Sequence, residues 1–323
     1  MNENLKRMLS VLKIDSNLRI RLDKIFDQQS PVTRIDLRGY ERGKKLAVDK
    51  EDLYVLLQIS KQIPTLQELV LLGDALDNES AILISKALPN IPSLTALYIE
   101  GSGIGDAGAD AVFSTLEEFP NITTIYMHGD KITDRGITDI ARSITRNRNI
   151  CALSIHSRLI GESGLSAIAS FLPLGSLKQI SVECPTVGDA TCKLLGQMIA
   201  ENSFLQGFAL KADSIVNAEA LMDGFRINSS LTEIVLSADN FSSSVASEVE
   251  MITKDICTRN AQGFFQVLVE KAMVELRERL GLKTHALDQV WRARVIDMMR
   301  TLPVAAQGIV DADADRMEHS HSP

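Results

Sequence analysis

The chain has few aromatic residues and no long apolar run. Phe, Trp and Tyr make up 5% of its 323 residues, with a single tryptophan. Such a composition is atypical of a β-sandwich or barrel and suits a core of leucine, isoleucine and alanine. The first residues, MNENLKRMLSVLKIDSN, lack the apolar stretch of a signal peptide, and no segment is long and apolar enough to span a membrane. We therefore expect no membrane partner, and a cytoplasmic location or export without a cleaved signal peptide.

Cysteine and positive charge are also scarce. The four cysteines show no CxxC spacing, which predicts reduced thiols in an intracellular setting rather than a disulfide framework. The chain carries 34 basic and 42 acidic residues, for a formal charge of −8 and a pI near 5.3. An acidic balance argues against a general affinity for nucleic acid, which requires a basic surface. We expect no nucleic-acid partner.

One apolar pattern occurs seven times. An apolar residue is followed by two variable residues, an apolar one, a variable one and another apolar one, and successive copies start 26 to 28 residues apart. A fixed period in this range is typical of a solenoid, in which each unit buries its apolar face against its neighbours. Positions are counted below from the first residue of each copy, namely Leu66, Leu94, Ile122, Ile150, Leu177, Leu205 and Leu231.

Each unit is predicted to contain a strand and then a helix. The first six residues alternate in hydropathy, as in a strand with one buried face. A further apolar residue follows at position 10, and pairs such as Gly105-Asp106 and Thr133-Asp134 then predict the start of a helix. An eighth, degenerate unit is predicted from Val32, with an insertion near residues 42–50.

These copies resemble the leucine-rich repeats, specifically the ribonuclease-inhibitor-like class with about 28 residues per unit. The resemblance implies an α/β solenoid with a curved parallel sheet on the concave side, helices on the convex side, and a ligand on the sheet. One column departs from the family, which usually places asparagine at position 8 to bond the turns along the stack. We expect that ladder to be altered throughout and broken at Arg158 and Pro185; position 8 holds Asp74, Ser102, Asp130, Arg158, Pro185, Asp213 and Asp239.

The ends of the chain differ from the repeats. Residues 1–31 are amphipathic and predict an N-terminal helical cap, followed by a repeat domain over residues 32–260. Residues 261–306 predict a C-terminal helical cap made of one helix at 264–280 and a second near 287–302. Residues 307–323 are polar and predict a disordered tail.

The strand positions 2, 4 and 6 should point away from the helices and form rows across the sheet, because neighbouring strands lie about 4.8 Å apart. In these rows two tyrosines are predicted to lie side by side, next to two histidines with a carboxylate at each end. We take this surface as the candidate partner-binding site, with the residues Tyr98, Glu100, Tyr126, His128, Ser154, His156, Glu183 and Lys211.

Several interpretations of this cluster are open at this point. Exposed tyrosines with flanking charge on a rigid sheet are typical of a protein-binding hot spot. The same row is also compatible with an ordinary solvated face that Glu–His contacts stabilise. Two histidines and two glutamates suit zinc chemically, but residues on adjacent strands point in parallel and do not converge on one ion. Ser154 and Ser181 lie near His156, yet nothing supplies an oxyanion hole. We therefore expect no catalytic residue, metal or cofactor.

One motif elsewhere suggests nucleotide binding. Gly103, Gly105 and Gly108 match the dinucleotide fingerprint G-x-G-x-x-G between a predicted strand and a predicted helix. No other unit repeats these glycines, and their place in the repeat explains them as turn residues. We favour the structural explanation.

Three functions are compatible with these patterns. The first is a non-enzymatic adaptor or regulator that binds a protein partner of unknown identity on the concave face. The second narrows this to a bacterial effector that acts on a host protein, because a eukaryotic-style repeat here has a short frame and an altered asparagine column. The third is an enzyme or regulator that uses the C-terminal helical segment, with the repeats recognising its substrate. A monomer is the default expectation.

Overall fold

The computed structural model describes Arg7, Ser10, Leu22 and residues 31–36, 40–41, 44–45, 50–119, 121–172 and 177–280. The expected N-terminal cap therefore lies almost entirely outside the described residues. So do the second C-terminal helix near 287–302 and the tail at 307–323. The described chain divides into two compact units, of which the first ends at Cys257 and the second begins at Thr258.

The first unit is built on one parallel sheet of eight strands, and each copy of the repeat supplies one strand. The order across the sheet follows the order along the chain, so every strand pairs with the strand of the next copy. The strands are β1 (Arg34–Asp36), β4 (Glu68–Leu72), β5 (Ala96–Glu100), β6 (Thr124–His128), β7 (Ala152–His156), β8 (Gln179–Val187), β9 (Gly207–Ile215) and β10 (Glu233–Ala238). The architecture is the α/β leucine-rich-repeat solenoid that the repeat predicts.

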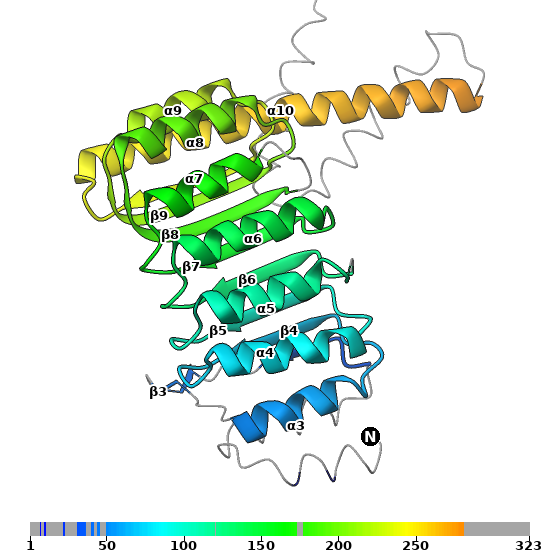
Figure 1. Cartoon of the computed structure of the whole chain (residues 1–323). Helices are drawn as coiled ribbons and strands as arrows, with labels where there is room; N and C mark the ends of the chain where they lie inside the picture. The colour runs from blue at the N-terminus through cyan, green and yellow to red at the C-terminus, as the bar shows by residue number, and fades with distance from the viewer. Residues whose placement is uncertain are drawn as a thin grey trace, which may run out of the picture. The chain divides into compact units, whose positions relative to one another are not determined.

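A helix follows the strand in each unit, and these helices stack in sequence order on one side of the sheet (Figure 1). Gly105 and Thr133 occupy the N-cap positions of two of them, as expected. The helices are α3 (Lys50–Ser60), α4 (Asn78–Ala87), α5 (Asp106–Leu116), α6 (Asp134–Arg146), α7 (Glu162–Phe171), α8 (Asp189–Glu201), α9 (Ala218–Ile227) and α10 (Ser243–Leu280), with a 3-10 turn at Leu88–Asn90.

The degenerate first unit is present. Ile35 in β1 is fully buried and pairs with Leu69 of β4, in the register that a repeat starting at Val32 requires. The predicted insertion contains a short antiparallel pair, β2 (Tyr40–Glu41) with β3 (Lys44–Lys45), before α3 begins.

The core lies between the sheet and the helices and runs the length of the array. Residues at positions 0, 3, 5 and 10 are buried in unit after unit, for example Leu94, Leu97, Ile99 and Ile104. Because every unit contributes the same four side chains, the core is one continuous cluster from Leu22 to Ile256.

A ladder of polar side chains joins the helix N-termini of successive units. In five units the first helical residue, at position 12, accepts a hydrogen bond from the next unit. Asn78 Oδ1 accepts from the backbone N–H of Gly105 at 2.8 Å, Asp106 Oδ1 from that of Thr133 at 2.7 Å, and Asp134 Oδ1 from that of Gly161 at 2.6 Å. We call the five residues Asn78, Asp106, Asp134, Glu162 and Asp189 the N-terminal ladder.

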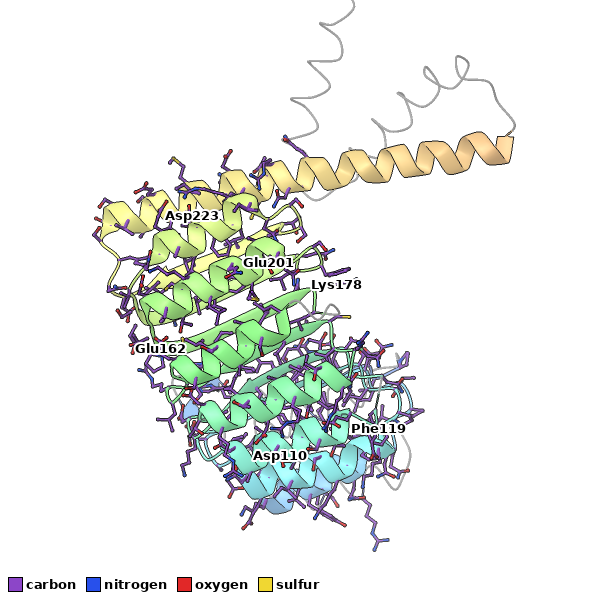
Figure 2. All side chains as sticks on the ribbon, turned by 45° about the horizontal axis from the view of Figure 1, so that its top comes forward. Asp110, Phe119, Glu162, Lys178, Glu201 and Asp223 are labelled. Carbon is purple, nitrogen blue, oxygen red and sulfur yellow. The ribbon has the colours of Figure 1, made fainter. Side chains whose placement is uncertain are left out.

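A second ladder joins the other edge of the helical layer. Three buried asparagines lie three residues before a repeat start, and each donates to a carbonyl of the preceding unit: Asn147 to Leu116, Asn202 to Leu172, and Asn228 to Ile199. Figure 2 shows Glu162, from the N-terminal ladder, at one edge of the layer, and Phe119 and Lys178 at the opposite edge. We call Asn147, Asn202 and Asn228 the asparagine ladder.

The altered column at position 8 does not disturb the stacking of the units. Its residues are exposed in most units. Two side-chain contacts of this column join different units: Ser102 Oγ donates to the carbonyl oxygen of Asp74 at 2.9 Å, and Arg158 lies 3.4 Å from Asp213. At Pro185 the turn is replaced by strand, since β8 and β9 continue to Val187 and Ile215 and remain paired. The stack therefore stays regular there, because strand pairing and the two ladders hold it.

The last helix starts earlier than predicted. The expected helix at 264–280 is the second half of α10, which begins at Ser243, the position-12 residue of the last repeat. Val249 and Ile256 on its first half belong to the core of the first unit. In the described part of the chain, no helix is both long enough and apolar enough to cross a membrane.

Candidate functional site

The predicted rows on the sheet are present in the predicted register. Tyr98 lies opposite Tyr126, and His128 lies opposite His156. Ser154 pairs with Ser181, His156 with Glu183, and Glu183 with Lys211. The helices α4 to α9 pack on the other face of the sheet, so these side chains lie on its open face.

The structure divides the candidate site into two parts. One is a depression of about 240 Å³ that crosses the strands from β5 to β10, which we call the groove. Both tyrosines and Ser154 line it. Its side chains at positions 2 and 4 are those of Tyr98, Thr124, Tyr126, Ala152, Ser154, Gln179, Ser181, Ala209, Glu233 and Val235, with Gly207 between them.

Side-chain size explains the shape of the groove. Its middle is lined by small residues such as Ala152, Ser154 and Ser181. At one end the rings of Tyr98 and Tyr126 stand with their centroids 6.3 Å apart and their planes tilted by 31°. At the other end Val235 leaves 49% of its surface exposed. The result is an apolar depression bounded by rings at one end and by Val235 at the other.

The second part is a charged row at position 6, which lines no part of the groove. His128 and His156 stack face to face, with centroids 3.9 Å apart and planes within 5°. Nδ1 of His128 lies 3.5 Å from Glu100 Oε1, and Nδ1 of His156 lies 3.4 Å from Glu183 Oε2. Lys211 Nζ continues the row at 3.0 Å from Glu183 Oε1. The row is thus an internally paired chain of side chains.

The stacked rings resist carrying two charges. Burial lowers the pKa of His156 below its ordinary value, and the neighbouring His128 lowers it further, while Glu183 acts in the opposite direction. A neutral His156 stacks on its neighbour without charge repulsion. The candidate residues at position 6 thus contact one another across the strands, whereas the two tyrosines line the groove.

The geometry gives the metal and catalytic interpretations no support. The histidine rings are parallel and do not converge, and within the described residues no three His, Cys, Asp or Glu side chains are grouped as metal ligands. Neither Ser154 nor Ser181 hydrogen-bonds to His156 in the described part of the chain. Burial raises the pKa of the Cys184 thiol to about 12, which keeps it protonated and poorly nucleophilic at neutral pH.

The dinucleotide-like glycines serve the repeat, as expected. The backbone N–H groups of Gly105 and Gly108, which a pyrophosphate would use, both donate to Asn78 Oδ1, at 2.8 and 3.0 Å. A side chain at Gly108 would collide with that oxygen. The preceding unit therefore occupies the place of a phosphate.

Sequence reasoning missed part of the groove. The candidate residues include the tyrosines and Ser154 but not those that shape the rest, chiefly Ser181, Ala209, Glu233 and Val235, although Ser181, Ala209 and Val235 stand in the predicted row at position 4. The sequence does carry a signal for the groove, namely small residues at positions 2 and 4 of consecutive units. Small side chains on neighbouring strands leave a depression in the surface of the sheet. The asparagine ladder was also detectable, as an asparagine three residues before three repeat starts.

No known family model and no curated protein sequence matches the chain. Among solved structures, it is similar to leiomodin-1 actin-binding site 2, at 17% identity over 72% of this chain and 99% of that one, with a TM-score of 0.36. It is also similar to TLR13 in its complex with ssRNA13, at 12% identity, with a TM-score of 0.31. That match covers 58% of this chain and 30% of TLR13. At these scores the fold assignment rests on the parallel sheet and its repeat.

Proposed function

We propose that the protein is a non-enzymatic binding module that holds a protein partner in the groove. The observation that carries this proposal is the groove itself, with two tyrosines at one end and a floor of small side chains. Aromatic residues beside a concave apolar surface are enriched where proteins bind one another. The rigid sheet beneath limits the loss of conformational freedom on binding.

The partner is expected to contact the tyrosines and the floor before the charged row. His128, Glu100 and Glu183 already have partners within the row, so breaking those contacts would offset part of any gain. Tyr98 and Tyr126 carry large apolar rings with polar hydroxyl groups, which suits them as anchors.

The experiment is an affinity capture with a variant that fills the groove. Ser181→Trp places a bulky ring on the floor at a partly exposed position, so the fold should tolerate it. Gln197→Trp on the exposed side of α8 adds the same ring to the helical layer. We expect one set of partners with wild type and Gln197→Trp, and its loss with Ser181→Trp. Partners retained equally by all three proteins would place the binding site elsewhere.

The narrower hypothesis of a bacterial effector acting on a host protein stays a prediction from the repeat alone. A reporter fused to the chain and followed into a host cell checks it, and a reporter that never enters would count against it. The alternative of an enzyme in the C-terminal segment concerns residues that lie mainly outside the described ones.

A further inference from the structure

We infer that the groove receives an α-helical segment of the partner with lysine and arginine residues along its flanks. This inference rests on the proposed function, and three observations carry it: the dimensions of the groove, the state of its backbone groups, and the charges along its borders.

The dimensions suit a helix. The groove is lined at positions 2 and 4, and the next outward-facing row, at position 6, borders it. From position 2 to this bordering row is four residues along a strand, about 13 Å at about 3.3 Å per residue. An α-helix with its side chains is about 10–12 Å wide. From β5 to β10 the groove crosses five strand spacings, about 24 Å, which corresponds to about 16 residues of helix at 1.5 Å each. The small side chains of Ser154, Ser181 and Ala209 let a helix approach the sheet closely.

The backbone beneath the groove offers nothing to an extended peptide. Strands β6 to β9 each pair with a neighbour on both sides, so their N–H and C=O groups are used within the sheet. An extended segment lying on this face would lose water from its own backbone groups without gaining partners for them. A helix satisfies its backbone internally and can present apolar side chains to the floor.

The ridge along one side of the groove is acidic. Along positions 6 and 8, from β5 to the end of the sheet, a ridge carries five carboxylates and two cations: Glu100, Asp130, Glu183, Asp213 and Asp239, with Lys211 and Arg158. Both cations are engaged in pairs, Lys211 with Glu183 and Arg158 with Asp213. The stacked histidines disfavour a double positive charge.

Two carboxylates are available to the partner. Glu233 lines the groove at the β10 end, with its side chain over Gly207. Asp239 is exposed on the ridge after the same strand. Within the described part of the chain, no lysine or arginine lies within ion-pair distance of either. Complementary charge would orient a basic helix and speed its association.

The test is a display selection with the full chain as bait. One library encodes 18-residue peptides with a fixed helical apolar stripe of Ala, Leu and Tyr, and Lys, Glu, Gln or Ser at each flanking position. A second library of the same length places a proline at its centre, which breaks the helix. We expect enrichment from the first library, with lysine selected over glutamate at the flanks.

Three variants then locate the enriched peptides. Ser181→Trp should weaken their binding at least tenfold. The isosteric double change Glu233→Gln with Asp239→Asn should weaken it about 3- to 10-fold and reduce its salt dependence. The matched control, Asp110→Asn with Glu118→Gln on the helical layer, should leave it unchanged; Figure 2 marks Asp110 there.

Each other result contradicts the inference. The enriched peptides could instead be neutral or acidic, or come from the proline library. If Ser181→Trp abolishes the binding of such peptides, the basic helix is overturned and the groove remains the binding site. Peptides indifferent to Ser181→Trp would overturn the proposed function as well. If neither library yields enriched peptides, only the inference of a basic helix is overturned. The capture experiment then decides the proposed function separately.

Discussion

The asparagine ladder concentrates much of the stack's bonding in a few side chains. Asn202 is 5% exposed, donates to the carbonyl of Leu172, and accepts from the N–H groups of Phe204 and Leu205 at 2.8 and 2.7 Å. One amide thus ties the end of α8 to the next strand and to the unit before it. Buried polar groups that lose their partners are costly, so these residues are sensitive positions.

We expect Asn202→Ala to lower the free energy of unfolding by about 2–3 kcal/mol, because one carbonyl and two N–H groups lose their partner. Chemical denaturation at fixed pH measures this change. Asn90→Ala, at an exposed asparagine outside the ladder, should change the free energy by less than about 0.5 kcal/mol. Equal effects of the two substitutions would contradict a structural role for the ladder.

The histidine stack makes stability depend on pH in a defined direction. The pKa of His156 in the folded chain lies below its ordinary value of 6.5, so the unfolded chain binds this proton more readily. The contribution of neutral His156 to the free energy of unfolding is therefore complete above pH 6.5. It is lost as the pH falls from 6.5 through the pKa of His156 in the folded chain.

Comparing unfolding at pH 7.5 and pH 5 for wild type and His156→Asn tests this direction. Wild type should lose more stability than the variant on acidification, because the variant lacks the titrating ring. Ser154→Asn on the same strand should show the wild-type dependence. An identical pH dependence for wild type and His156→Asn would refute the account of the stack.

Single residues were predicted only where their place in the repeat determines them. The register of Tyr98 with Tyr126 and of His128 with His156 follows from the repeat frame, and it was predicted correctly. The bonds of Asp106 and Asn202 were not predicted, because they depend on which neighbouring backbone group comes within reach after the units stack.

Among the elements, α8 and α9 pack unusually closely, and glycine makes this possible. Gly196 and Gly224 share position 19 of their units, and each faces the backbone of the adjoining helix. A Cβ at Gly224 would overlap the carbonyl oxygen of Gly196, and a Cβ at Gly196 would overlap that of Ala220. Backbone cannot move aside as a flexible side chain can, so the two helices would have to separate.

We expect Gly224→Ala to lower the free energy of unfolding by about 1–3 kcal/mol, although alanine is the better helix former by about 1 kcal/mol. The overlap with α8 outweighs the helical preference. Thermal and denaturant unfolding measure the outcome, with Asp223→Ala on the exposed side of α9 as a control that should change little. A stabilised Gly224→Ala would show that the helices are not in close contact there.

Element boundaries were predictable inside the repeat and less so at its end. The strands begin near position 2 and the helices near position 12 because apolar spacing and capping residues mark both. At the last repeat, α10 runs from Ser243 past the end of the periodic pattern, since no glycine or proline interrupts it before Gly263. The break in the apolar pattern at residue 260 was taken as a boundary, whereas the helix continues through it.

At the scale of the whole molecule, the solenoid follows from the repeat because each unit can bury its apolar face only against the next. The open face is a consequence of the same geometry, since the helices lie on one side of the sheet. The shape of the groove was not predictable from the frame, because it depends on the particular sizes of side chains at positions 2 and 4 of six units.

The central claim is that a protein partner lies in the groove, and site-specific photocrosslinking tests it most directly. A photoreactive phenylalanine analogue replaces Ser181 on the floor of the groove or, in a matched protein, Gln197 on the exposed side of α8. After irradiation in cell lysate, the account predicts one discrete adduct from position 181 and none from position 197. Equal adducts from both positions, or an adduct from position 197 alone, would contradict it.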